Sequence, residues 1–238
     1  MDYRIRMPDL AWNRRWGLEL TRYARNKPVE QYGLHWGDPA LTGLRYWRAK
    51  LLLGDRLPGN LSRVVARYIR PYVSPEKTVL EIGFGGGRWT HYLLEARRII
   101  LVELNPEFYP YVEALYPQAR HKLEFYQTSG CELRGVASQS IDYAFSFGTF
   151  VHIDAAGIDE YISHVARVLR PGATAVIHYA DKSKPFFRKH PPAFTAAFSD
   201  VTVAEMLAVV RRHELVLVHH DTRLLNHSNI LVLRRPRG

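Results

Sequence analysis

"VLEIGFGGGRWT", residues 79–90, places four glycines within five positions directly after a short apolar run. Such a run followed by glycines is typical of a buried strand that ends in a tight turn. Because glycine has no Cβ atom, the turn lets a ligand come close to the backbone. The stretch therefore predicts a buried strand that ends at a ligand-binding loop.

Downstream of this strand, short apolar runs alternate with amphipathic stretches, which is typical of a doubly wound α/β domain. The apolar runs predict strands over 78–82, 99–103, 123–127, 141–147, 173–179, 215–220 and 229–234. The stretches between them predict helices near 87–96, 106–116, 155–169 and 200–212. We therefore expect an α/β domain with a Rossmann-like, seven-stranded sheet over residues 71–238.

The last two predicted strands are separated only by "DTRLLNHS", residues 221–228. This connection suits a hairpin, because a parallel crossover needs about a dozen residues or more. We therefore expect the last strand to run antiparallel to the rest. Its first residues, 226–228, would then lie at the carboxyl edge of the parallel strands.

The glycine loop does not fit the two commonest nucleotide-binding patterns. A dinucleotide fingerprint needs glycine at its first, third and sixth positions, and counting from Gly83 the sixth position is Arg88. A phosphate-binding P-loop is excluded because no Gly-Lys-Ser/Thr follows. The pattern present is acidic-x-Gly-x-Gly-x-Gly, from Glu81 to Gly87.

This pattern resembles the first motif of the class I S-adenosylmethionine-dependent methyltransferases, and the resemblance extends over about residues 75–238. "ILVELN" ends the second strand with an acidic residue, Glu103, twenty residues beyond Gly83. "SIDYAFSFGTFVHI", 140–153, is similar to the family's fourth strand and active-site loop, and "RVLRPGATAVIHYAD", 167–181, to its helix, turn and fifth strand. The terminal hairpin is also a family feature. The resemblance implies S-adenosyl-L-methionine as cofactor and S-adenosyl-L-homocysteine as product.

The resemblance also implies a cofactor site on this loop. Gly83, Gly85 and Gly87 would lie against the methionine part of the cofactor, Glu81 would orient its amino group, and Glu103 would accept hydrogen bonds from the ribose hydroxyls. The other cofactor-binding residues that we expect are Phe84, Leu104, Ser129, Gly130, Cys131 and Phe147.

Two of these expectations leave alternatives open. The family's third motif supplies an acidic residue near the adenine amine, whereas this chain has "QTSGCEL", 127–133. Backbone groups of Gly130 and Cys131 would then replace it. Phe147 either packs against the adenosyl group or fills the core.

Methyl transfer to a hydroxyl requires removal of a proton, for which histidine is well suited at neutral pH. Ligands of an open parallel sheet bind outside the carboxyl ends of its strands, where His152, His178 and the histidines of the last hairpin are expected. We expect His152 to be the catalytic base and His178 the second candidate, with Asp181 beside it. A magnesium site is the alternative, but "VHIDAAGID" lacks the carboxylate cluster that a hard cation prefers, so no metal site is predicted.

The acceptor is expected to be a small molecule or a glycan. The loop "SFGTF", 146–150, lacks the Asn/Asp-Pro-Pro-aromatic pattern of nucleic-acid amino-methyltransferases, and Cys131 lies on the wrong loop for cytosine-5 chemistry. The loop instead resembles that of O-methyltransferases for sugars, glycan ends and natural products. The connection 181–198 is either a wall of the acceptor pocket or a surface crossover. N-methylation, RNA methylation and cofactor binding without catalysis remain alternatives.

The net charge of +10 is concentrated in the first part of the chain. Residues 1–70 hold 14 Lys and Arg against 6 Asp and Glu, whereas 71–238 hold 19 against 17. We expect residues 1–70 to form a basic helical cap in which arginines such as Arg45 and Arg48 face an anionic acceptor or an anionic membrane surface. With no secretion signal and no apolar stretch long enough to cross a bilayer, the chain is expected to be cytoplasmic.

Overall fold

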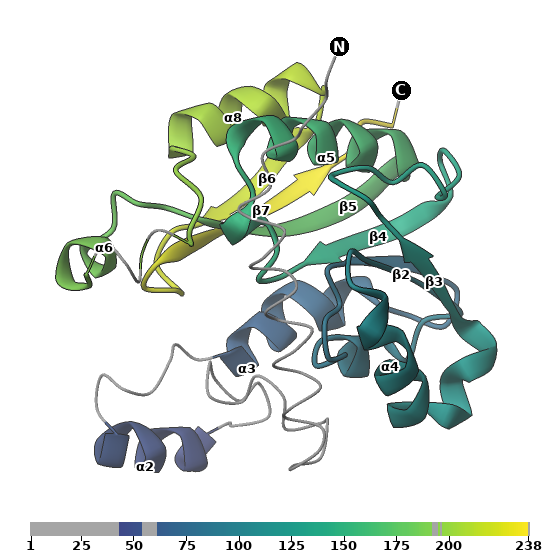
Figure 1. Ribbon diagram of the computed structural model, residues 1–238, viewed down its shortest axis with the longest axis horizontal. Coiled ribbons are helices and arrows are strands. Elements are labelled where there is room, and N and C mark those ends of the chain that lie inside the picture. Colours follow the sequence, from purple (N-terminus) through teal and green to yellow (C-terminus); the bar gives the residue numbers. More distant parts are fainter. Residues whose placement is uncertain (1–42, 54–60, 192–194, 196, 238) are drawn as a thin grey trace.

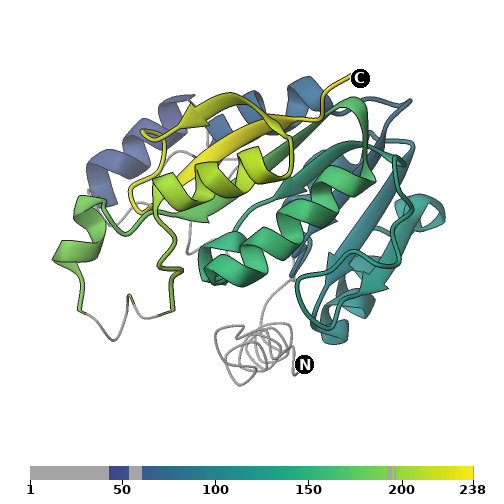
Figure 2. The same cartoon turned by 90° about the horizontal axis from the view of Figure 1, so that it is seen from above.

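The computed structural model describes residues 43–53, 61–191, 195 and 197–237. Within them, a twisted sheet lies between two layers of helices (Figures 1 and 2). Helices α5 (Ala155–Val168) and α8 (Val203–Arg212) cover one face, while α3 (Leu61–Val64) and α4 (Tyr109–Leu115) lie on the other. This arrangement confirms the predicted Rossmann-like α/β fold.

The sheet has seven strands in the order β3-β2-β1-β4-β5-β7-β6. The strands are β1 (Thr78–Ile82), β2 (Arg98–Glu103), β3 (Leu123–Gln127), β4 (Ile141–Ser146), β5 (Leu169–Ala180), β6 (Val216–Asp221) and β7 (Ser228–Arg234). Strand β7 pairs antiparallel with both β5 and β6, and the other pairs are parallel. The predicted terminal hairpin is therefore confirmed, and the start of β7 pairs with the end of β5 through Ser228 and Ala180.

The central strands are apolar along their whole length because both of their faces are covered. All five residues of β1 are buried. Leu80 and Ile82 belong to the core beneath α5 and α8, whereas Val79 belongs to the core on the opposite face. Burial on both faces explains why these strands read as continuous apolar runs rather than alternating ones.

The remaining described elements are short: α2 (Gly43–Leu53), η4 (Val65–Ile69), η5 (Arg70–Tyr72), η6 (Thr90–Leu93), η7 (Pro106–Phe108), η8 (Pro117–Lys122), η9 (Phe150–His152) and α6 (Pro185–Lys189). Much of the expected basic cap, 1–42 and 54–60, lies outside the described residues. Residues 61–72 belong to the sheet's own core, where Val64 and Ile69 are fully buried. The cap therefore stays a prediction.

The helix expected near 87–96 is wrong. This segment consists of turns around the single 3-10 helix η6. Two features oppose a regular helix: Gly87 has a φ of +78°, and the next residues include Trp89 and Thr90, whose helix propensities are low. The Thr90 hydroxyl donates a 2.6 Å hydrogen bond to the Glu81 carboxylate, so the segment is fixed to β1 by a side chain instead.

Strands β1 and β4 lie at the centre of the sheet, where the order of the strands reverses. In open α/β sheets, ligands bind outside the carboxyl ends of the strands at such a point. The hydroxyls of Ser146 and Thr149 both donate to the Ile82 carbonyl, at 2.9 and 3.1 Å. These bonds tie the glycine loop to the loop after β4, and the candidate site lies there.

Candidate functional site

The glycine loop is built from backbone conformations that favour glycine. Gly83 and Gly85 have φ values of +73° and +50°. A Cβ atom on Gly83 would lie 1.9 Å from the Thr149 hydroxyl, so this position serves the packing of the two loops. A Cβ atom on Gly85 would meet nothing within 4 Å. Gly85 therefore exposes backbone to open space, as a bound ligand requires.

Beneath this loop lies a buried carboxyl group. Glu81 is 1 % exposed, and burial raises its pKa to about 8, although the hydrogen bond from Thr90 opposes the shift. Glu103 lies near enough to raise this pKa further. In the unliganded protein Glu81 is therefore mostly protonated at neutral pH, and a positively charged ligand on the loop would favour its ionised form.

Glu103, at the end of β2, is partly exposed and holds the loop by its carboxylate. Its Oε1 accepts hydrogen bonds from the amides of Leu104 and Asn105, and its Oε2 accepts one from Gly85 at 3.0 Å. Each carboxylate oxygen has two acceptor positions, so Oε2 can accept one more bond. Glu103 can therefore bind a ligand hydroxyl while it positions Gly85.

Two predicted cofactor residues have buried side chains. Phe84 is 3 % exposed and packs against Tyr109 and Phe125, with ring centroids 5.6 Å apart in both pairs. Cys131 is fully buried, and burial raises the pKa of its thiol, so it is an unreactive core group. Both residues can face a ligand only through their backbone.

The loop after β3 is closed by its own hydrogen bonds. The Glu132 carboxylate accepts from the amide and the hydroxyl of Ser129, at 2.9 and 3.0 Å. The single proton of the Thr128 hydroxyl can be donated to the carbonyl of Gly130, at 2.9 Å, or to that of Glu132, at 3.2 Å. Glu132 is thus an acidic residue of this loop that the sequence analysis missed, because it lies three residues after Ser129 rather than directly after the strand.

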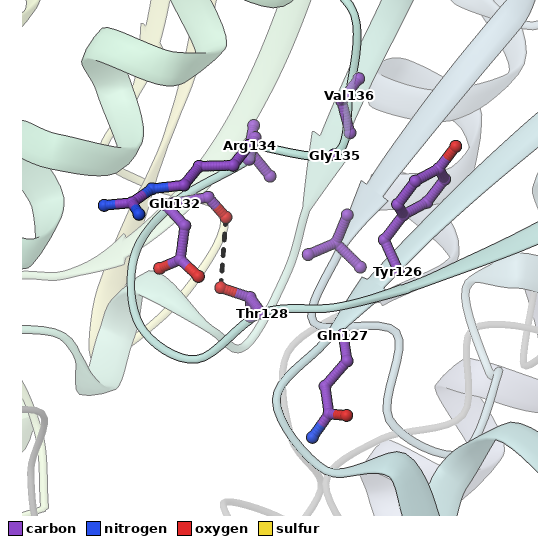
Figure 3. A pocket seen from close by; sticks show the side chains of 9 residues that line it. Tyr126, Gln127, Thr128, Glu132, Arg134, Gly135 and Val136 are labelled. Carbon is purple, nitrogen blue, oxygen red and sulfur yellow. Dashed lines mark hydrogen bonds between the residues drawn. The ribbon is translucent and has the colours of Figure 1, made fainter.

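A pocket lies under the connection from β3 to β4 (Figure 3). It is lined by Val102, Tyr126, Gln127, Thr128, Glu132, Leu133, Arg134, Gly135 and Val136. None of these is a predicted site residue. The pocket is therefore separate from the glycine loop and from the histidines.

His178, near the end of β5, is buried, and both of its ring nitrogens are engaged. The Gly148 amide donates to Nδ1 at 3.0 Å, so the neutral ring carries its proton on Nε2, which lies 2.5 Å from the Ser228 hydroxyl. Burial holds the pKa of this histidine well below its ordinary value. Phe147 stacks on the ring at 3.9 Å between centroids. His178 therefore joins the loop after β4 to β7.

His152 has a different arrangement, in η9 after β4. Its Nδ1 lies 2.7 Å from the Ala197 carbonyl, and a carbonyl only accepts, so Nδ1 carries the proton. In the neutral ring, Nε2 is then the nitrogen with the basic lone pair. Burial lowers the pKa of His152 to about 4, so the ring is neutral at pH 7. His152 can thus accept a proton through Nε2.

His227, just before β7, completes the cluster of histidines expected at this edge. Its ring centroid lies 5.9 Å from that of His178, and burial lowers its pKa to about 4. The other hairpin histidines point elsewhere: His219 stacks on Tyr68, and His220 lies 2.9 Å from the Tyr179 hydroxyl.

Asp181 shapes the turn after β5. Its Oδ1 accepts from the amide and the hydroxyl of Ser183, and its Oδ2 from the side-chain amide of Asn229 at 2.9 Å. Burial raises the pKa of Asp181, but these hydrogen bonds outweigh burial and lower it overall. Asp181 is therefore an ionised carboxylate with both oxygens engaged. Within the described part of the chain, no group of three or more His, Cys, Asp or Glu side chains is arranged to hold a metal ion.

Comparisons with known proteins agree with this geometry. The family model described as "Methyltransferase domain" matches residues 79–172, which include the glycine loop, Glu103 and His152. Residues 79–172 therefore match a methyltransferase domain. No curated protein sequence matches the chain.

Solved structures share the fold of this methyltransferase domain at low sequence identity. An S-adenosylmethionine-dependent methyltransferase from Methanosarcina mazei is 18 % identical, with a TM-score of 0.59 over 72 % of this chain and 98 % of its own. Geranyl diphosphate C-methyltransferase from Streptomyces coelicolor A3(2), solved with S-adenosyl-L-homocysteine, is 11 % identical, with a TM-score of 0.61 over 92 % and 98 %. The [4+2]-cyclase SpnF is 12 % identical, with a TM-score of 0.66 over 94 % and 93 %.

The residues of the methyltransferase domain fit S-adenosylmethionine. The open space over Gly85 accommodates a ligand against the backbone, and the ammonium of the methionine part would favour the ionised form of Glu81. Glu103 retains an acceptor position for a ribose hydroxyl. When bound, the cofactor supplies an electrophilic methyl group on a sulfonium.

The buried carboxyl of Glu81 makes the stability of the unliganded protein depend on pH. Its pKa of about 8 exceeds the unfolded value of about 4.3, so between these values the folded state binds more protons than the unfolded state. The free energy of unfolding should therefore fall as pH rises from about 4.5 to 8, relative to Glu81→Gln. Urea unfolding of both proteins across this range measures the difference. Parallel curves would show that Glu81 ionises as in the unfolded chain.

Proposed function

We propose that the methyltransferase domain transfers a methyl group to a hydroxyl oxygen of a small molecule, a sugar or a glycan, with His152 as the base. The observation that carries the proposal is the hydrogen bond from Nδ1 of His152 to the Ala197 carbonyl. It fixes the tautomer in which Nε2 can take a proton. The position of His152 after β4, at the carboxyl edge next to the glycine loop, supports the same role.

The other residues of this edge have supporting roles in the proposal. Phe147 and His178 pack together, and the hydrogen bond from the Gly148 amide to His178 fixes the loop that leads to His152. Asp181 orders the turn after β5. These contacts would hold the base in position, and correct positioning supplies much of the acceleration of an in-line displacement.

The experiment that tests the function is an acceptor screen with the full chain. S-adenosylmethionine carrying a labelled methyl group is incubated with the protein and with fractionated extracts. S-adenosylhomocysteine should form together with an equal amount of a labelled methyl ether, identified by mass spectrometry. A labelled N-methyl product in place of the ether would contradict the assignment to oxygen.

We also propose that the basic N-terminal region contacts an anionic surface. Helix α2 supports this idea, because Leu44, Trp47 and Leu51 are 64–87 % exposed and Arg45 and Arg48 lie between them. Exposed apolar and basic groups on one short helix are typical of segments that lie on membranes. No helix in the described ranges combines the length and apolarity needed to span a bilayer.

Charge reversal of Arg45 and Arg48 to glutamate should weaken binding to vesicles that contain phosphatidylserine. Each basic residue near an anionic membrane is worth about 1 kcal/mol, so two reversals should cost at least tenfold in partitioning. Sedimentation with vesicles measures the effect, and phosphatidylcholine vesicles are the control. Equal binding of wild type and variant would exclude this role for α2.

A further inference from the structure

A continuous row of rings leads from the glycine loop to the histidine cluster. Trp89, which follows the loop, lies 4.6 Å from Phe147 between ring centroids. Phe147 lies 3.9 Å from His178, and His178 lies 5.9 Å from His227. The row begins where the cofactor is held and continues along the carboxyl edge of the sheet. Trp89 and His178 are buried, so the surface that this row can offer to an acceptor comes from Phe147 and His227.

The connection between β5 and α8 extends the row with phenylalanines. Phe198 lies 5.4 Å from both His227 and His152, and Phe186 lies 5.3 Å from His227. These four side chains are only partly buried, so they retain surface for a ligand. Aromatic rings favour flat partners in stacked or edge-to-face contact. The surroundings of His152 therefore present flat apolar surfaces.

The imidazoles among these rings are neutral at neutral pH, and the nearby lysines are engaged by other groups of the protein. Burial lowers the pKa of His152 and of His227 to about 4, so both imidazoles are neutral. Lys182 pairs with Asp200. The ammonium of Lys184 donates to the backbone carbonyls of Thr222, Leu225 and Ser228 at 2.6–2.8 Å, which uses all three of its protons. These residues offer little to an anionic acceptor.

The basicity of His152 indicates which kind of hydroxyl group the acceptor carries. An imidazole with a pKa of about 4 is a weak base. A phenolic hydroxyl, with an ordinary pKa of about 10 as in tyrosine, is much more acidic than the hydroxyl of a sugar or an aliphatic alcohol. A weak base removes a proton more easily from a stronger acid, so His152 favours a phenol over an aliphatic alcohol. The aromatic rings favour a flat partner, and a phenol meets both conditions.

We propose that the acceptor is a neutral, planar aromatic molecule with a phenolic hydroxyl, which lies against the exposed parts of Phe186, Phe198 and His227 with this hydroxyl at Nε2 of His152. This inference rests on the proposed O-methylation. The O–H bond breaks and its proton goes to Nε2, while the oxygen forms the new bond to the methyl carbon and the electron pair of the broken C–S bond stays on sulfur. The imidazolium then releases its proton to water.

The test compares flat acceptors with their saturated counterparts. The full chain and labelled S-adenosylmethionine are incubated with 1-naphthol or decahydro-1-naphthol, with 4-methylphenol or 4-methylcyclohexanol, and with methyl glucoside. The phenol of at least one pair should be methylated with a kcat/KM at least tenfold above that of its saturated partner. In parallel, calorimetry should detect binding of that phenol to the protein saturated with S-adenosylhomocysteine.

Variants that remove a ring but keep apolar volume test the lining. Phe198→Leu and Phe186→Leu should each weaken binding of the phenol about 2- to 10-fold, the range expected for one aromatic pair. Tyr111→Leu, on α4 beneath the opposite face of the sheet, is the matched control and should leave this binding unchanged.

Two results would overturn the proposal in different ways. Methylation of the saturated alcohols or of methyl glucoside in preference to the phenols would contradict the acceptor class and leave O-methylation intact. Binding of a phenol without methyl transfer to any hydroxyl compound would contradict the proposed function itself, and the acceptor assignment would fall with it. Absence of both binding and transfer for the two phenols would also contradict the acceptor class.

Discussion

Replacing Gly85 with leucine should weaken binding of S-adenosylhomocysteine ten- to hundredfold. Gly85 has a φ of +50°, and open space lies where its Cβ atom would be. A side chain there would occupy the space over the loop backbone, and filling a fitted site costs about 1–3 kcal/mol. Titration calorimetry measures the loss, which corresponds to about 1.4–2.8 kcal/mol.

Gly43 provides a matched control, because its φ is +51° and its Cβ atom would also meet nothing within 4 Å. Gly43→Leu carries the same backbone strain, about 1–2 kcal/mol, but should bind S-adenosylhomocysteine as the wild type does. Gly83→Ala should instead lower the free energy of unfolding, since its Cβ atom would overlap the Thr149 hydroxyl. Equal affinities of wild type and Gly85→Leu would show that the cofactor does not lie on this loop.

Replacing His152 with alanine should lower kcat about 10²- to 10⁴-fold and leave the affinity for S-adenosylhomocysteine unchanged. Only the proton transfer depends on this side chain in the proposed mechanism. Because its pKa is about 4, the imidazole is unprotonated at neutral pH, so wild-type kcat should fall only as pH falls through about 4 to 5. The pH–rate profile with a phenolic acceptor measures this limb.

His152→Asn separates catalysis from structure. The asparagine side-chain amide can donate to the Ala197 carbonyl, as Nδ1 does, but it cannot accept the proton. We expect it to be as inactive as His152→Ala, while His121→Ala, at an exposed position in η8, remains fully active. Recovery of activity in His152→Asn would mean that His152 acts by holding residue 197.

Most of the fold could be predicted because local and tertiary preferences agree. The strands read as apolar runs because both faces of the sheet are covered, and the six residues between β6 and β7 are too few for a crossover helix. The helix predicted over 87–96 failed for a physical reason. Thr90 hydrogen bonds to a buried carboxylate, and such a long-range contact leaves no periodic signal in the sequence.

The sequence predicted which edge of the sheet carries the site residues, but not the contacts that these residues make. Topology predicted that His152, His178 and the start of β7 lie at one edge; in the structure His178 contacts Ser228 and His227, and Phe198 contacts both His152 and His227. Topology could not distinguish the tautomers, because these depend on the Gly148 amide and the Ala197 carbonyl. Phe186 and Phe198 were not identified individually from the sequence, because their contacts with His227 depend on the tertiary structure.

The central claim is that the methyl donor lies on the glycine loop with its sulfur directed toward His152. A crystal structure of the full chain with S-adenosylhomocysteine tests this claim most directly. We predict that the ribose hydroxyls bond to the Glu103 carboxylate, that the homocysteine part lies over Gly85, and that the sulfur faces the cluster of His152, His178 and His227. A ligand bound elsewhere, or one whose sulfur points away from His152, would contradict the account.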